Sequence, residues 1–490
     1  MAYKHGAYGE ITASKVTDAQ QSNVVAAYIG TAPINLIRGY AEKGLTNMPI
    51  KVANMSDAQS KLGYSDNWEG FTLCEAFAQH FDNTVGNVGP IYIVNVLDPD
   101  THKKAEATTE ELTFTNQRAE FENSDIILDT FAIADKVEGV DYSLEYNFAK
   151  GTVVVKLLTE SETDTLQCSY NTVDTAAVKE GDIIGQTTED GQYTGLHALK
   201  LIYQYHNAVL NLLAAPGWSQ IPAVYKAMVS VVQKLNGHWD GFVNADIPLE
   251  DAEGNPINTI AKAIAWKAAN GYTSEFSKVY WPQIKDGSGR VFHLSTAGQA
   301  TMLRVDLSHE GVPFESPSNK EIMATAQYFG AAAKNNGFDQ QTANGLNEKG
   351  ITTACFWGGQ WVLWGPHTAA FAYNGGTDAR AIFDVNIRML MHITNSFQMD
   401  HGTEIDAPMT PQDRDTVLNF ERQKLDTLLG IGALIGTPSV EFLETENSET
   451  DMMNGDFVWN FSVTNTPPFK SGTARVSYTD EGFAAFFETA

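Results

Sequence analysis

The stretch Gly89-Pro90-Ile91-Tyr92-Ile93-Val94-Asn95-Val96-Leu97 decides the fold class of this sequence. It is a nearly continuous apolar run, bounded by a Gly-Pro pair at its start and by Asp98-Pro99 after its end. A strand with one face in water alternates apolar and polar residues, whereas a strand buried on both faces is apolar throughout. The stretch therefore predicts a central strand of a mostly parallel sheet that helices cover.

Strands and helices alternate on either side of this stretch. We expect strands at residues 23–30, 209–215, 239–246 and 277–281, and helices at residues 56–62, 73–81, 197–205, 221–235 and 257–269. Strands that alternate with helices across short loops are typical of an α/β fold.

An aromatic cluster follows later in the chain. Trp357, Trp361 and Trp364 surround the pair Gly358-Gly359, which predicts a hairpin or tight turn. We expect the three tryptophans to pack in a core, and a sugar-binding platform is the less favoured alternative.

The composition narrows the class of protein. The chain has 490 residues, more than one hydrophobic core usually holds. Hydrophobic residues make up 43% and charged residues 19%, which excludes a disordered chain. Lys and Arg number 32 against 60 Asp and Glu, and the formal net charge is −28. Such an acidic chain repels phosphates, which disfavours binding to bare nucleic acid or to an anionic membrane.

Half of the net charge lies in one fifth of the chain. Residues 98–195 hold 21 acidic and 7 basic residues, a net charge of −14. Within this segment apolar and polar residues alternate over short runs such as 141–146, which indicates antiparallel strands with one solvated face. We therefore expect an acidic antiparallel β-sandwich inserted into an α/β host.

Targeting and redox signals are absent from the sequence. No N-terminal run joins basic residues to an apolar stretch of signal-peptide length, and no window approaches the roughly 18 apolar residues of a membrane helix. Cys74, Cys168 and Cys355 are far apart along the chain. We expect reduced thiols in a protein made in cytoplasm, without disulfides or a cysteine-based zinc site.

The C-terminal part of the chain has its own pattern. Residues 380–397 and 413–429 predict long helices, and residues 441–443 and 457–463 predict strands. Residues 441–456 carry six acids and no base, which indicates a solvated loop.

The two ends of the chain do not fit a core. Residues 1–21 contain few large apolar side chains and show no periodicity. Near the other end, Ala474, Val476 and Tyr478 alternate with polar residues as in a strand, but no local hairpin partner follows. Such a strand either joins the sheet of another chain or adds to its own domain, and the sequence favours neither alternative.

The usual signatures of enzymes and cofactors are missing. Neither a Gly-x-x-x-x-Gly-Lys-Ser/Thr phosphate loop nor a Gly-x-Ser-x-Gly nucleophile elbow occurs. Residues 430–436 imitate a dinucleotide fingerprint, but they follow a helix, so we expect a helix C-terminal turn there. The spacing of His392 and His401 does not suit a ligand pair on one helix, so we expect no metal site.

One enzymatic alternative stays open. In Ser295-Thr296-Ala297-Gly298 small residues follow the serine, so a serine hydrolase with Ser295 as its nucleophile is the alternative function. A nucleophilic serine needs a base and an orienting acid, and the spacing selects no such pair.

Several segments, in their order along the chain, resemble motifs of the contractile tail sheath proteins of bacteriophages and phage-tail-like (R-type) bacteriocins. The most specific is residues 300–319, which resembles the family's helix with Arg-x-Asp, then Gly-Val and Ser/Ala-Pro-Asn. His5 replaces a proline of the family's opening motif, and His367 stands where an arginine is common. The other similar segments are residues 5–10, 30–33, 89–96, 212–217, 346–351, 362–368 and 384–390.

The resemblance implies an α/β multidomain protein with a subtilisin-like core that lacks a working catalytic triad, and hence no enzyme and no cofactor. The domains it implies are a N-terminal arm (1–21), the first part of the α/β core (22–97), the acidic β-sandwich insertion (98–195), the subtilisin-like α/β domain (196–377), a C-terminal α+β domain facing the tube (378–465) and a C-terminal arm (466–490).

The resemblance also implies a subunit that polymerises as stacked six-fold rings around an inner tube and contracts to drive the tube through a bacterial envelope. Its partners would be further copies of itself, the inner tube protein, and baseplate and tail terminator proteins, but neither nucleic acid nor membrane. It would be assembled in the bacterial host cytoplasm and become part of a virion tail or phage-tail-like particle. The arm residues expected at contacts between subunits are Tyr3, Tyr8, Ile11, Ala474, Arg475, Val476, Tyr478 and Phe483.

We expect the C-terminal domain to face the tube and the acidic insertion to face outward, where its charge stays solvated. Arg414, Arg422 and Lys424 on the helix at 413–429 are candidate tube contacts, and a plain solvated helix face is the favoured alternative.

Overall fold

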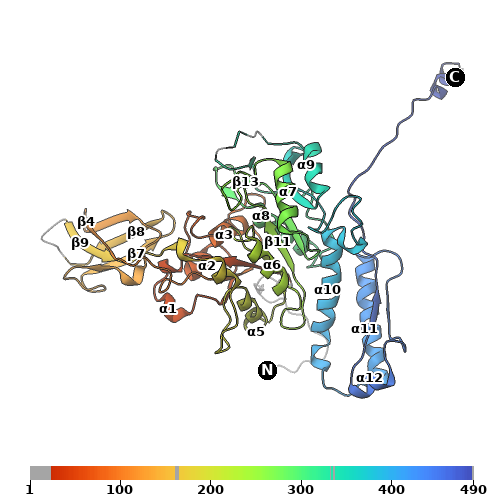
Figure 1. The fold of residues 1–490 in the computed structure, drawn as a ribbon, viewed down its shortest axis with the longest axis horizontal. Helices are drawn as coiled ribbons and strands as arrows, with labels where there is room; N and C mark the ends of the chain where they lie inside the picture. Colours follow the sequence, from red (N-terminus) through yellow and green to blue (C-terminus); the bar gives the residue numbers. More distant parts are fainter. Residues whose placement is uncertain (1–23, 160–164, 332, 335–336, 488–490) are drawn as a thin grey trace, which may run out of the picture. The chain divides into compact units, whose positions relative to one another are not determined.

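The computed structural model describes residues 24–159, 165–331, 333–334 and 337–487, and its fold is mixed α/β (Figure 1). The described residues form two compact units. Unit 1 comprises the chain up to residue 218 together with residues 306–312, and unit 2 comprises residues 219–305 and the chain from residue 313 onward.

Unit 1 contains four sheet strands in the order β10-β1-β3-β2. β1 (Val25–Gly30) pairs in parallel with both β10 (Leu210–Ala214) and β3 (Ile91–Asn95), whereas β2 (Pro49–Val52) runs antiparallel to β3. Every residue of β1 and β3 is buried, as the continuous apolar run at 89–97 predicts.

Helices pack beside this sheet. α3 (Leu73–Phe81) contacts β1 and is buried along its whole length. α2 (Met55–Leu62) begins one residue before the predicted start, because the Asn54 side chain accepts a hydrogen bond from the Asp57 N–H and caps the helix. The other short elements of unit 1 are η1 (Ile34–Leu36), α1 (Tyr40–Lys43), η2 (Leu128–Thr130), η3 (Thr175–Ala177), α4 (Glu180–Ile184), η4 (Gly195–Lys200) and α5 (Leu201–His206).

Two antiparallel sheets of three strands each follow the first part of unit 1, in the orders β4-β9-β6 and β5-β8-β7. Val153 and Val155 of β8 pack with Phe131 and Tyr170 in a shared core, whereas the charged side chains of Glu111 on β4 and Lys156 on β8 are exposed. The strands are β4 (Thr108–Thr113), β5 (Arg118–Glu122), β6 (Ala132–Ile133), β7 (Tyr142–Asn147), β8 (Thr152–Leu157) and β9 (Thr165–Tyr170). Figure 1 shows them in orange and yellow, grouped apart from α2 and α3.

Unit 2 contains four strands in the order β17-β16-β12-β11. β11, β12 and β16 run parallel to one another. The chain then turns at Gly358 and Gly359, and β17 pairs antiparallel with β16. Both glycines have positive φ angles, 61° and 89°, which explains the glycine pair at this turn. The strands are β11 (Phe242–Asp246), β12 (Ser277–Tyr280), β16 (Ile351–Trp357) and β17 (Gln360–Trp364).

The remaining elements before residue 370 surround these strands. A small antiparallel sheet has the order β14-β13-β15. The elements are α6 (Pro222–Val231), α7 (Ile260–Asn270), β13 (Gln283–Lys285), β14 (Val291–Phe292), α8 (Leu294–Ser308), β15 (Ala326–Tyr328) and α9 (Gln340–Asn347).

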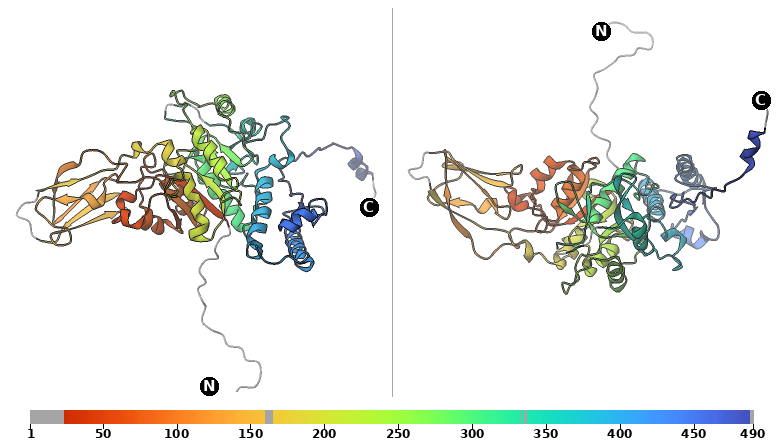
Figure 2. Two further views of the ribbon diagram at one scale, coloured as in Figure 1. Left: turned by 60° about the horizontal axis from the view of Figure 1, so that its bottom comes forward. Right: turned by 90° about the horizontal axis from the view of Figure 1, so that it is seen from above.

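The C-terminal part of unit 2 consists of two long helices that lie side by side, and a short sheet (Figures 1 and 2). Its elements are η5 (Ala379–Ala381), α10 (Asp384–Asp400), η6 (Gly402–Glu404), α11 (Pro411–Gly430), β18 (Ser439–Glu441), α12 (Glu449–Asn454), β19 (Asn460–Ser462) and η7 (Glu481–Phe486). The prediction of a plain loop at 441–456 is wrong. α12 forms there because Ser448 accepts a hydrogen bond from the Asp451 N–H and caps a helical turn.

Candidate functional site

Ser295 does not belong to a catalytic triad. It is fully buried in the first turn of α8, and its hydroxyl donates to the Asp246 carboxylate. Its backbone N–H donates to the other carboxylate oxygen at 2.9 Å, and Ser219 donates to the same group at 3.2 Å. A nucleophile needs an accessible hydroxyl next to a base, whereas this serine ties a helix to the end of β11. The serine hydrolase alternative is therefore wrong.

The other sequence candidates for small-molecule chemistry have structural roles. Residues 430–436 form the turn that ends α11, with positive φ angles at Gly432 and Gly436. The three cysteines are buried free thiols. Across the described ranges, no three His, Cys, Asp or Glu side chains converge as metal ligands would. The helices of this part of the chain are all too short or too polar to cross a membrane.

A sheet of only two strands lies near the C-terminal end of unit 2. β18 and β19 pair antiparallel over three residues each, from Ser439 opposite Ser462 to Glu441 opposite Asn460. No third strand joins them among the described residues. Two short strands are marginally stable alone, and here α11 packs against β18. Both outer edges of this sheet therefore offer backbone groups to another strand.

Buried polar atoms around β19 lack hydrogen-bond partners. Trp459 Nε1, Asn460 Nδ2 and Asn465 Oδ1 are shielded from solvent without a partner in the described residues. The Asn465 amide donates to the Asn386 backbone carbonyl at 3.1 Å, yet the Asn386 side-chain oxygen also has no partner. Each such atom costs about 1–3 kcal/mol, and proteins rarely leave four of them together. The side-chain hydrogen bonding around β19 is therefore incomplete within the described residues.

Apolar side chains are exposed beside the same sheet. Val458 is 43% exposed, and Ile435 and Leu443 are exposed to a similar degree. We call these three side chains, together with β18 and β19, the sheet surface. Exposed apolar groups next to open strand edges are typical of a surface that a partner covers.

The C-terminal arm leaves unit 2 as an extended trace that ends in η7 (Figure 2). Residues 470–479 contain no strand, and Val476 and Tyr478 are 91% and 85% exposed. The alternative in which this segment completes a sheet of its own domain is not seen within the described part of the chain. Ala474, Arg475 and Phe483 are exposed too. Tyr3, Tyr8 and Ile11 lie outside the described residues.

The candidate tube residues lie on α11 in unequal surroundings. Arg414 Nη2 binds the Asp415 carboxylate at 2.6 Å, and Lys424 Nζ binds Asp400 Oδ2 of α10 at 2.6 Å. Arg422 is exposed and forms no ion pair with a described residue. The structure thus leaves Arg422 available, whereas Lys424 already helps to hold α10 and α11 together.

α10 is anchored to the sheet of unit 2 by a buried ion pair. Lys278 Nζ of β12 lies 2.7 Å from Asp384 Oδ2 in the first turn of α10, and both side chains are completely buried. Burial lowers the pKa of Lys278, while the Asp384 carboxylate opposes this shift. Farther along, His401 bridges the helices: its Nε2 lies 2.8 Å from Glu421 Oε1 of α11. These contacts fix the two long helices before any partner binds.

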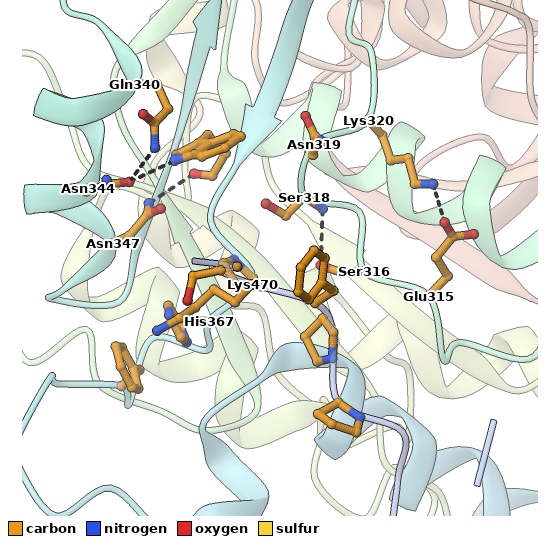
Figure 3. A pocket seen from close by; sticks show the side chains of 18 of the residues that line it. Glu315, Ser316, Ser318, Asn319, Lys320, Gln340, Asn344, Asn347, His367 and Lys470 are labelled. Carbon is orange, nitrogen blue, oxygen red and sulfur yellow. Dashed lines mark hydrogen bonds and ion pairs between the residues drawn. The ribbon is translucent and has the colours of Figure 1, made fainter. Parts of the chain in front are cut away.

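A cavity of about 870 Å³ adjoins the beginning of the arm (Figure 3). We call residues 466–472 the stem. The stem forms one wall, and the other walls are α9, the β16–β17 hairpin and the segment 314–320. Figure 3 shows Lys470 of the stem close to His367, and the ion pair of Glu315 and Lys320 on the opposite side.

The sequence predicted the C-terminal arm, but it predicted neither the sheet surface nor the cavity beside the stem. The predicted strand at 457–463 already contained a signal for the sheet surface. There the indole N–H of Trp459 and the side-chain amide of Asn460 place polar groups within a mostly apolar pattern. The signal for the cavity was weaker. Pro467-Pro468 indicates a stiff extended segment, but nothing in the sequence tells which surface that segment crosses.

Known proteins resemble this chain along nearly its whole length. A scan against protein-family models finds no match. The chain is 25% identical over 506 aligned residues to a tail sheath protein of Burkholderia phage BcepMu, and the alignment covers 97% of each chain. The fold matches a chain of the contracted PVC sheath complex of an extracellular contractile injection system, with a TM-score of 0.55, 12% identity and coverage of 98% and 99%. It also matches a chain in the baseplate of the anti-feeding prophage, with a TM-score of 0.56, 13% identity and coverage of 98% and 100%.

Proposed function

The chain belongs to the contractile tail sheath proteins of phages and phage-tail-like injection systems, and we propose that its copies stack as six-fold rings around an inner tube. Contraction of this sheath would drive the tube through a bacterial envelope. The alignment along 97% of the chain is the observation that carries this proposal. The protein is a structural subunit, not an enzyme, which agrees with the buried Ser295 hydroxyl.

Strand exchange through the arms would hold the subunits together. The C-terminal arm presents alternating residues, with Val476 and Tyr478 exposed, and contains no strand of its own. The sheet surface offers what the arm lacks, namely two open strand edges and exposed apolar side chains such as Val458. An added strand supplies main-chain hydrogen bonds along an edge, and its alternate side chains cover the apolar groups. The N-terminal arm would add a second strand in the same manner.

Contraction in this proposal needs no nucleotide. Main-chain hydrogen bonds of exchanged strands survive while domain surfaces shift, so the subunits stay connected as the rings repack. The free energy would come from interfaces that improve on contraction. The α/β part, which we propose to have a subtilisin-like topology, would move as a rigid body during this change.

We propose that the C-terminal domain faces the tube and that the acidic insertion at 98–195 faces outward. The net charge of −14 stays solvated on an outer wall and limits side-by-side association of particles. Arg422 is the best candidate for a tube contact, because it is exposed and has no described ion-pair partner. Partners beyond the tube would be baseplate and tail terminator proteins, and assembly would take place in the bacterial host cytoplasm.

Electron microscopy of the full chain tests the assembly proposal. The protein is expressed alone, separated by size and examined by negative staining. Hollow tubes or rings with six-fold end views are expected, if necessary after addition of the tube protein encoded beside it. Monomers that stay monomeric in the presence of that tube protein would contradict the proposal.

Charge substitutions test the sheet surface separately. Val458→Asp places a carboxylate beside β19 on an already exposed position, so it should abolish polymerisation and leave the thermal unfolding temperature nearly unchanged. Val137→Asp in the insertion is the matched control, since Val137 is also exposed but lies far along the chain from the sheet. Polymers of normal length from the Val458 variant would exclude this surface as the docking site.

A further inference from the structure

The cavity beside the stem has an aromatic platform. Trp357 ends β16 and is 48% exposed, so the expectation that it packs in a core is wrong. Trp364 lies next to it, with ring centroids 5.8 Å apart. Trp364 is held in place because its Nε1 donates to Asn344 Oδ1 of α9 at 3.1 Å. Two neighbouring indole rings therefore line the cavity, and that of Trp364 is held by α9.

Polar groups with unused hydrogen-bonding capacity surround this platform. The hydroxyl oxygens of Ser316 and Ser318 accept backbone N–H groups, so their hydroxyl protons remain available to donate. Glu348 lines the cavity and forms no ion pair with a described residue. Gln340 and Asn344 bind each other at 3.3 Å, as Figure 3 shows, which leaves the Gln340 oxygen as an acceptor.

His367 adds a buried acceptor. Its ring is stacked on Phe371 and is only 4% exposed. Nδ1 lies 2.8 Å from the Ile382 carbonyl oxygen, which can only accept, so Nδ1 carries the proton and Nε2 the lone pair. Burial lowers the pKa of His367 to about 4, so the ring is neutral at pH 7. Nε2 has no partner among the described residues, and His367 lines the cavity.

The charges of the lining disfavour a charged ligand. Glu315 and Lys320 neutralise each other in an ion pair, and Glu348 and Lys470 carry opposite charges. A phosphate-bearing ligand would need a surplus of cations, which this lining does not provide.

The backbone of the site also disfavours a peptide strand. The edge of β17 that would form a ladder is already occupied, since the Leu363 N–H donates to the Lys320 carbonyl at 2.9 Å. The Ile322 N–H likewise donates to the Trp361 carbonyl at 3.0 Å. An extended peptide would therefore find side chains but no open strand edge.

We propose that this cavity is a binding site for an uncharged oligosaccharide. The apolar faces of sugar rings would stack on Trp357 and Trp364, and sugar hydroxyls would bond to the serine hydroxyls, Glu348 and His367 Nε2. The volume of about 870 Å³ lies within the usual range of about 300–1,000 Å³ for small-ligand sites. This site is separate from the sheet surface, but one of its walls is the stem, which is the beginning of the C-terminal arm.

Titration of the purified full chain with neutral trisaccharides tests this inference. Maltotriose, cellotriose and chitotriose serve as probes, and binding is read by saturation-transfer NMR and by tryptophan fluorescence. At least one probe should saturate the site with a dissociation constant of about 1 mM or below. Failure of all three probes to saturate below about 10 mM would overturn the proposal.

A pair of neighbouring aromatic variants decides whether the binding is specific. Trp357→Ala removes half of the platform and should weaken binding at least about tenfold, whereas Phe356→Ala should leave it unchanged. Phe356 is a matched control, because it is exposed to a similar degree on the same strand (57% against 48%) but does not line the cavity. Equal losses in the two variants would show non-specific stacking and would contradict the site. Circular dichroism of both variants checks that the hairpin stays folded.

Discussion

The strands β1 and β3 and the strands β18 and β19 show two kinds of sheet in one chain. Every residue of β1 and β3 is buried, and each of these strands has a partner on both sides. β18 and β19 have three residues each and one partner each, with exposed apolar side chains such as Val458 beside them. The first sheet is complete within the chain. The second has unused edges and unpartnered polar atoms, as expected for a sheet that neighbouring subunits complete.

This difference separates folding from assembly. Substitutions in the buried strands should unfold the subunit and impair assembly only as a consequence. Substitutions in the sheet surface or the arm should impair assembly while the subunit keeps its free energy of unfolding.

The largest loss of stability is expected from Asp384→Ala. This variant leaves the Lys278 ammonium fully buried without its partner, which should lower the free energy of unfolding by about 3–5 kcal/mol. Denaturant unfolding measures the loss. Asp415→Ala removes the carboxylate of an exposed ion pair on α11 and should change the stability by less than about 1 kcal/mol. Similar values for the two variants would mean that the buried pair does not anchor α10.

Ile93→Ala tests the complete sheet directly. Ile93 is fully buried in the middle of β3, so truncation leaves a cavity and should cost about 3 kcal/mol. Val476→Ala in the arm truncates an apolar side chain that is 91% exposed, and it should leave the unfolding midpoint unchanged. The comparison fails if the arm variant destabilises the isolated subunit as much as the β3 variant does.

Acid should weaken the C-terminal region through one buried and one half-buried histidine, His367 and His392. Burial lowers the pKa values of His367 and His392 from 6.5 to about 4 in the folded chain. Between these values the unfolded chain binds more protons, so stability is complete above pH 6.5 and falls as the pH drops towards 4. At pH 5 each histidine should cost about 2 kcal/mol relative to pH 7.

The variant His392→Gln isolates one of the two histidines. Its unfolding free energy should fall by about 2 kcal/mol less than that of the wild type between pH 7 and pH 5. An identical fall in both proteins would show that His392 is not the group that titrates. Urea denaturation at the two pH values provides the measurement.

The smallest effect concerns the beginning of α11. Thr410 accepts the Asp413 N–H, and the Asp413 carboxylate accepts the Thr410 N–H at 2.9 Å, which forms a capping box. Thr410→Ala should cost about 1 kcal/mol. Thr416→Ala within the same helix should cost nothing, since alanine favours helix interiors. Thermal unfolding of both variants distinguishes a cap from a general effect of losing threonine.

The sequence predicted the regular part of the fold because strong patterns there agree with tertiary burial. The apolar run at 89–97 contains β3, and α3 has the predicted bounds. The glycine pair forms the predicted tight turn between β16 and β17. Boundaries shifted where a side chain capped a helix, as Asn54 does for α2. α12 was missed because its acidic composition resembles that of a loop.

The candidate surfaces were harder to predict because they depend on which distant segments meet. Alternation at 474–478 identified the arm, but only the structure shows that β19 carries polar atoms without partners. The walls of the cavity beside the stem come from segments about 150 residues apart in the sequence. A local sequence pattern does not show that such segments lie together in the fold. Ser295 looked catalytic because small residues surround it, and the same smallness suits its buried place beside Asp246.

The measurement that tests the account most directly compares assembly and stability of one arm variant. In Val476→Pro combined with Tyr478→Pro, two prolines interrupt the strand that we expect to pair with a neighbour. Val476→Ile combined with Tyr478→Phe is the control, because it changes the same positions but keeps both backbone N–H donors and side chains that favour a strand. Sedimentation should show polymers for the wild type and the control but monomers for the double proline variant, with equal unfolding temperatures. Normal polymers from the double proline variant, or a lowered unfolding temperature, would contradict strand exchange through this arm.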